Sequence, residues 1–273
     1  MNRTALALAA SLAAMIMAPG IAKADTHFDI APYLQDGKLS TGGLDHSGSH
    51  TAPPISVYGY EFSEDPYDPF NPTDPGINQA AGVGNLPAGS PLRYNILSSL
   101  LYWDGDGGIA WGTPVSDTHV DLWMGTATRT LTGSSGAQAG SLIQSVAADG
   151  VVHKHFVTSL FADYTSSNVP GESGFLAPAD GIYAFSMELT LTQGSTVYAS
   201  DPFWIVFNNG MSEEVHGAAM SNLVPEPASM SLLALGGLAM LRGRNRRGMC
   251  NLSTESCGTG VAGQAPAGPV PGY

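Results

Sequence analysis

The chain has 273 residues and a formal net charge of −13, and its acidic residues are concentrated in one segment. Residues 25–227 hold 22 of the 23 acidic residues but only four of the ten basic ones, which gives this segment a net charge of −18. A surface this acidic repels phosphate backbones and excludes nucleic acid as a partner. The two cysteines, Cys250 and Cys257, lie beyond this segment, so we expect neither disulfides nor thiolate metal sites within it.

Residues 1–24 have the order of charged and apolar residues that is typical of a secretory signal peptide. Arg3 is followed by the short apolar run ALALAASLAAMIMAP, and small residues, Ala22 and Ala24, precede Asp25. The run is too short for a membrane span, and no stop-transfer charges follow it. We therefore expect a signal helix that is cleaved near Ala24 and an exported domain over residues 25–222.

A proline-rich stretch over residues 64–76 (EDPYDPFNPTDPG) places an Asp or Asn before a proline at every third position. These residues are Asp65, Asp68, Asn71 and Asp74. A residue before proline favours extended geometry, and a polyproline II helix has three residues per turn, so the four side-chain oxygens would share one edge. We interpret the stretch as a stiff acidic surface loop, with a cation site as the alternative.

Several later segments alternate apolar and polar residues with the period of two that is typical of strands. They are residues 118–125 (THVDLWMG) and 181–194 (GIYAFSMELTLTQG). The stretch 195–210 contains the apolar run FWIVF, which is typical of a buried strand. Residues 90–103 (SPLRYNILSSLLYW) fit either a pair of strands or one helical turn. Strands separated by Gly, Pro, Asp and Ser predict an all-β fold, an antiparallel β-sandwich of immunoglobulin-like or jelly-roll-like type with long loops.

Three short motifs place potential metal ligands two residues apart. On a strand, side chains at i and i+2 point to the same face, so each pair would share one face. Imidazole nitrogens and carboxylate oxygens are ligands that zinc accepts, and one ion could draw ligands from several strands. Any single pair can equally be structural, but three such pairs make a zinc site a serious hypothesis. The candidate ligands are His27, Asp29, His119, Asp121, His153 and His155.

Motifs for catalysis are missing from the sequence. It has no Gly-x-Ser-x-Gly elbow, no His-Glu-x-x-His and no phosphate-binding loop, so we expect no enzymatic activity. The stretch WDGDGG at residues 103–108 lacks the later acidic positions of a calcium loop, which makes calcium the less favoured ion.

The C-terminal part combines three ordered features within residues 223–247. A Pro-Glu-Pro motif comes first, then an apolar run over residues 228–241, then a cluster of arginines. This order resembles the PEP-CTERM sorting signal of bacteria that have exosortases, and the resemblance rests on Pro225, Glu226, Pro227, Arg242, Arg244, Arg246 and Arg247. It implies a transmembrane anchor before processing, an exosortase-like membrane enzyme as partner, and a final place at the cell surface or in an extracellular polysaccharide matrix.

Two features depart from that family pattern. The apolar run has 14 residues, fewer than the ~20 of a typical spanning helix. In addition, residues 248–273 follow the arginines, and their richness in Gly, Pro, Ala and Ser predicts a disordered tail.

The segment before the sorting signal also resembles a group of PEP-CTERM proteins that the zinc-uptake regulator represses. The similar stretches include THFDIAPYLQDGKL, VHKHFVTSLF and SDPFWIVFNNG. The resemblance implies a part in zinc capture and singles out His27, His119, His153 and His155. The sequence thus predicts an exported surface protein that binds a divalent metal. The alternatives are a structural or adhesive matrix module without a ligand and, less favoured, a secreted hydrolase.

Overall fold

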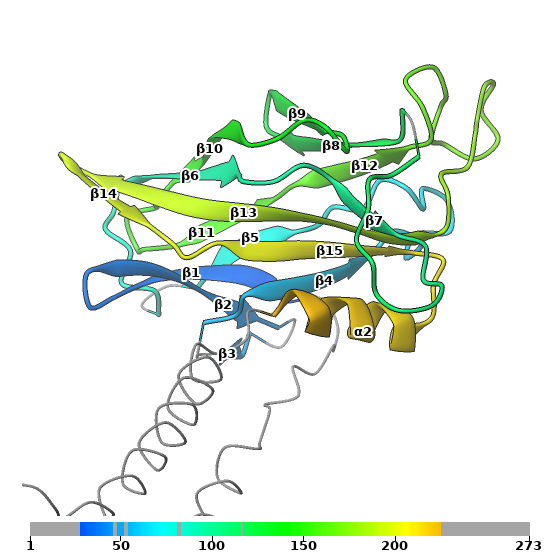
Figure 1. The fold of residues 1–273 in the computed structure, drawn as a ribbon. Coiled ribbons are helices and arrows are strands. Elements are labelled where there is room, and N and C mark those ends of the chain that lie inside the picture. The colour runs from blue at the N-terminus through cyan, green and yellow to red at the C-terminus, as the bar shows by residue number, and fades with distance from the viewer. Residues whose placement is uncertain (1–27, 46–47, 52–53, 81–82, 116, 225–273) are drawn as a thin grey trace, which may run out of the picture. The chain divides into compact units, whose positions relative to one another are not determined.

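Strands dominate the computed structural model, which describes residues 28–45, 48–51, 54–80, 83–115 and 117–224 (Figure 1). They form three sheets, and the all-β prediction is confirmed. The ambiguous stretch at residues 90–103 contributes two strands rather than a helical turn.

The first sheet has five strands in the order β11-β5-β1-β2-β3. Strand β1 pairs antiparallel with β2 and parallel with β5, which in turn pairs antiparallel with β11. The bounds are β1 (Asp29–Gln35), β2 (Lys38–Leu44), β3 (His50–Thr51), β5 (Gly76–Gln79) and β11 (Val152–His155).

The second sheet has seven strands and is organised around the long strand β13 (Gly181–Gln193). Strands β6, β7, β14 and β15 all pair with β13 in antiparallel fashion, β10 pairs with β6, and β4 runs parallel to β15. The remaining bounds are β4 (Val57–Glu61), β6 (Pro91–Ile96), β7 (Leu101–Trp103), β10 (Gln138–Ser145), β14 (Thr196–Ala199) and β15 (Phe203–Asn209).

The third sheet has three strands, β8 (His119–Met124), β9 (Ala127–Leu131) and β12 (Val157–Phe161), in the order β12-β8-β9. The chain passes from β11 of the first sheet into β12 after one residue, Phe156. The first and third sheets are therefore joined along a single extended segment.

One apolar core draws buried side chains from all three sheets, for example Ile30, Leu122 and Phe185. This packing is that of a sandwich. The strand pairing differs from the predicted antiparallel arrangement at two places, because β1 runs parallel to β5 and β15 runs parallel to β4.

A helix that the sequence did not predict, α2 (Glu213–Leu223), covers the outer face of the second sheet along β4 and β15 (Figure 1). Ser212 caps its N-terminus by accepting a hydrogen bond from the Val215 backbone N–H. Its buried residues, His216, Ala219 and Met220, follow the i, i+3, i+4 spacing of a helix face. Such a face is too short and too weakly apolar to give a clear periodic signal in the sequence.

Three predicted segments lie wholly or mostly outside this description. The signal peptide of residues 1–24 and the tail of residues 248–273 lie outside the described residues, and so does nearly all of the sorting signal at residues 223–247. Within the part of the chain that is described, no helix is long and apolar enough to cross a membrane.

Candidate metal centre

The outer face of the first sheet brings together residues that are far apart in the sequence. His155 of β11 lies opposite Gly76 of β5, and the parallel pairing of Ile30 with Ile77 places Asp29 of β1 on the other side of the same glycine. A Cβ atom at Gly76 would meet both Asp29 and, at 2.8 Å, Cε1 of His155. The missing side chain therefore allows Asp29 and His155 to approach each other across the middle strand.

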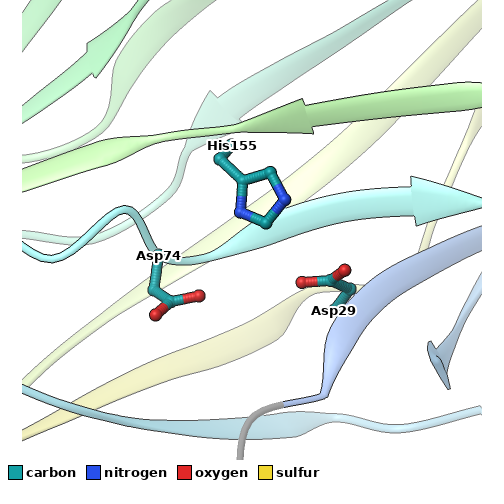
Figure 2. A group of neighbouring side chains, drawn as sticks. All are labelled: Asp29, Asp74 and His155. Atoms are coloured by element: carbon teal, nitrogen blue, oxygen red, sulfur yellow. The ribbon is translucent and has the colours of Figure 1, made fainter. Parts of the chain in front are cut away.

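Asp74 completes a three-residue group with Asp29 and His155. One ligand atom from each residue lies within 4.8 Å of the others, and both carboxylates face the imidazole (Figure 2). The two aspartates are half-buried and His155 is exposed, so an ion from solvent can reach the group. Two carboxylates and one imidazole form a donor set that suits zinc or a similar divalent ion.

Hydrogen bonds fix the orientation of the His155 ring. Its Nδ1 lies 2.9 Å from the Thr73 carbonyl oxygen, and because a carbonyl only accepts, Nδ1 must donate. Nε2 then carries the lone pair, and in this structure that lone pair accepts a hydrogen bond from Nε2 of His153. A backbone carbonyl that holds the second ring nitrogen is the usual support of a metal-binding histidine.

His153 lies next to this group, two residues before His155 on the same strand face. The two Nε2 atoms are 3.1 Å apart. Two nitrogen ligands on a tetrahedral zinc ion lie about 3.3 Å apart, given zinc–nitrogen bonds of ~2.0–2.1 Å. His153 and His155 therefore have a nitrogen spacing close to that of two ligands on one ion. Both rings are exposed, so they can rotate to complete the coordination geometry.

Asn78 supports the aspartate of the group. Its Nδ2 donates to Asp29 Oδ2 at 3.0 Å, and Asn78 is the cross-strand partner of His153. This bond orients the Asp29 carboxylate, as hydrogen bonds to the ligands do in metal sites.

The structure does not bring His119 and Asp121 to this group. His119 pairs with Phe161, which is six residues beyond His155, or about 20 Å along an extended chain. Its ring is buried and stacked on Phe161 and Tyr164, with Nδ1 at 3.0 Å from the Asp117 carbonyl. The Asp121 carboxylate accepts a hydrogen bond from Thr130. Both side chains are therefore engaged in contacts at the third sheet, away from Asp29, Asp74 and His155.

His27, the remaining candidate ligand, lies outside the described residues. The structure instead adds Asp74, which the sequence suggested only as one member of the proline-rich stretch. That stretch does not run as a regular polyproline helix. Asp65 and Asp68 close successive turns, because their backbone carbonyls accept from the N–H groups of Asp68 and Asn71. Asp74 lies two residues before β5, which places it beside the first sheet.

Comparison with protein families identifies residues 223–247 as a PEP-CTERM protein-sorting motif. The motif implies processing by an exosortase-type membrane enzyme, and hence export to the cell surface or the extracellular space. The comparisons with curated proteins and with solved structures gave no match. The resemblance to zinc-regulated proteins stays a prediction.

Proposed function

We propose that this exported surface protein binds a divalent metal ion, zinc in the first place, without catalysing a reaction. Asp29, Asp74 and His155 supply the ligands, and His153 supplies a fourth. The observation that carries the proposal is the convergence of Asp29, Asp74 and His155, from two strands and a loop, with Nε2 of His153 3.1 Å from Nε2 of His155.

Electrostatics favour the binding of a cation. Residues 25–227 carry a net charge of −18, which raises the concentration of cations near the surface. Lys38 pairs with Asp201, which lies just after β14, and not with Asp29 or His155. A zinc-binding role at the cell surface would fit capture of a scarce ion outside the cell.

The test measures zinc bound per chain by equilibrium dialysis of the full chain against micromolar zinc. The double substitution His153→Ala/His155→Ala should remove one bound zinc per chain relative to the unchanged protein. Asp121→Asn is the matched control, because Asp121 was a candidate ligand by sequence but lies apart from the group, and it should bind as much zinc as the unchanged protein.

Thermal unfolding provides the second measurement. A ligand that binds only the folded state raises the melting temperature, by the equivalent of about 2.7 kcal/mol at 100 times its Kd. Zinc should therefore stabilise the unchanged protein more than the double variant. Equal zinc content and equal melting shifts in both proteins would contradict the proposal and favour a structural or adhesive module.

A further inference from the structure

The outer face of the third sheet carries exposed aromatic side chains beside hydrogen-bonding ones. In β8 the alternate residues Val120, Leu122 and Met124 are buried in the core, so the residues between them point outward. Trp123 is one of these, and it is 45% exposed although a tryptophan is usually highly buried. Figure 1 shows β8 and β9 on the outside of the molecule. An exposed tryptophan on such a face is typical of a binding surface.

The strand register places an apolar row next to a polar row on this face. Trp123 lies opposite Val157 of β12 and Thr128 of β9. In the next outward row Asp121 lies opposite Thr130, whose hydroxyl donates to Asp121 Oδ1 at 2.6 Å. The other carboxylate oxygen, Oδ2, accepts no hydrogen bond from the described residues, so it is available to a ligand.

Tyr164 provides a second exposed aromatic ring beyond the polar row. It stacks on His119, with centroids 4.4 Å apart and 16° between the ring planes, and it is 61% exposed. His119 and Trp123 are four residues apart on β8, which is about 13–14 Å along a strand. The two exposed rings therefore flank Asp121, which lies midway between His119 and Trp123.

This alternation of aromatic and polar side chains suits a chain of sugars. A pyranose ring has an apolar face of C–H groups, which packs on an aromatic ring, and a rim of hydroxyls, which donate to a carboxylate and exchange hydrogen bonds with other hydroxyls. Sheet faces bind oligosaccharides in other β folds. Because strands hold Trp123 and Asp121 in place, little conformational entropy is lost on binding.

Charge limits the kind of partner. Residues 25–227 carry a net charge of −18. Arg129 is the only lysine or arginine in the three strands, and its guanidinium donates to the backbone carbonyls of Thr128, Ala139 and Gly140. Such a surface repels an acidic polysaccharide, and it repels a second copy of the same chain for the same reason.

We propose that the outer face of the third sheet binds a neutral polysaccharide. Trp123 and Tyr164 stack against sugar rings, and Asp121 between them accepts hydrogen bonds from sugar hydroxyls. The surface shares no residue with the metal ligands of the first sheet, so this proposal does not depend on zinc binding.

Affinity electrophoresis of the full chain tests the proposal, in native gels that each contain one polysaccharide. The probes are two neutral polymers, a galactomannan and hydroxyethyl cellulose, and the acidic polymer alginate. A chelator is present throughout, so that no bound metal contributes. We expect at least one neutral polymer to retard the protein and alginate to leave its mobility unchanged. Absence of retardation by both neutral polymers would overturn the proposal.

Substitutions at Trp123 distinguish sugar stacking from a general apolar contact. Trp123→Leu should weaken binding at least about tenfold, as truncation of a central interface aromatic does, and Tyr164→Ala should weaken it from the other end. Trp123→Tyr keeps an aromatic ring and should retain most of the affinity. The control Val197→Ala removes an exposed apolar side chain from β14 of the second sheet and should bind as before.

The same variants show whether a protein covers the face instead. Equal binding by Trp123→Leu and the unchanged protein would contradict a sugar site at Trp123, and so would equal losses in Trp123→Leu and Trp123→Tyr. Sedimentation measures the oligomeric state of each variant. A dimer that Trp123→Leu dissociates would assign the face to a second copy of the chain and overturn the proposal.

Discussion

Gly76 contributes no ligand atom, yet it allows the proposed ligands Asp29 and His155 to approach each other. Asp29 and His155 lie on either side of it across three strands, and their side chains close over the space that a Cβ atom would occupy. A substitution at this glycine therefore tests whether the site can form while every ligand residue stays in place.

We predict that Gly76→Ala lowers zinc affinity at least tenfold although every ligand is retained. The added methyl group meets the Asp29 carboxylate and the His155 ring, which must move apart. Disturbing the groups that orient metal ligands typically costs 10–100-fold in metal affinity. Isothermal titration with zinc measures the effect. Gly108→Ala is the control, since a Cβ atom there has nothing within 4 Å. Unchanged affinity in Gly76→Ala would show that the ion does not bind between Asp29 and His155.

Sequence reasoning at the residue scale named Asp29 and His155, which the structure brings together, and their neighbour His153. The i, i+2 spacing of His153 and His155 predicts a shared strand face, and Asp29 followed from the same rule. Asp74 and Gly76 could not be recognised, because their importance depends on the pairing of β1, β5 and β11, whose residues are about 50 to 80 positions apart. His119 lies apart from this group, because spacing alone cannot tell a ligand from a ring stacked on Phe161 and Tyr164.

Helix α2 lies close to strand β4 at Gly59, where an added side chain would meet the helix. Val57 and Gly59 lie on the face of β4 that the helix covers, and Ala219 and Met220 pack from the helix side. The sequence predicted β15 from the apolar run FWIVF and its partner β13 from alternation, but it did not single out β4. It did not predict the helix, whose contact with the sheet rests on one face of three buried residues.

We predict that Gly59→Ala loosens α2 and destabilises the protein by about 1–3 kcal/mol, the usual cost of overpacking. The new Cβ atom would lie 2.5 Å from Sδ of Met220, so the helix must shift. Hydrogen exchange of the α2 amides and chemical denaturation measure the two effects. Shortening the obstructing side chain should relieve the clash, so Gly59→Ala/Met220→Ala should lose less stability than the sum of the two single changes. Strict additivity would contradict this packing.

At the scale of the whole molecule, buried tyrosines connect the two layers of the sandwich. Tyr58 donates its hydroxyl to the Gly42 carbonyl at 2.8 Å, and Tyr60 donates to the Phe28 carbonyl at 2.9 Å, so strand β4 is linked to the first sheet. Tyr183 donates to the Ala179 carbonyl at 2.8 Å. Burial raises the pKa of all three phenols above the ordinary value of about 10, because the charged form would lose its hydration.

These raised pKa values predict that the sandwich loses stability as the pH rises above about 10, where the phenols of the unfolded chain ionise. Above that pH the folded state binds more protons than the unfolded state, so the free energy of unfolding falls with pH, by about 1.4 kcal/mol per pH unit for each buried phenol. Chemical denaturation between pH 8 and about 12, with tyrosinate absorbance recorded in parallel, measures the slope. Tyr60→Phe should reduce that slope by about 1.4 kcal/mol per pH unit, the contribution of one phenol. At neutral pH the same change should cost about 1 kcal/mol of stability, because the hydrogen bond to the Phe28 carbonyl is lost. A slope that Tyr60→Phe leaves unchanged would mean that this phenol ionises without unfolding the protein, and that the link from β4 to the first sheet does not depend on its proton.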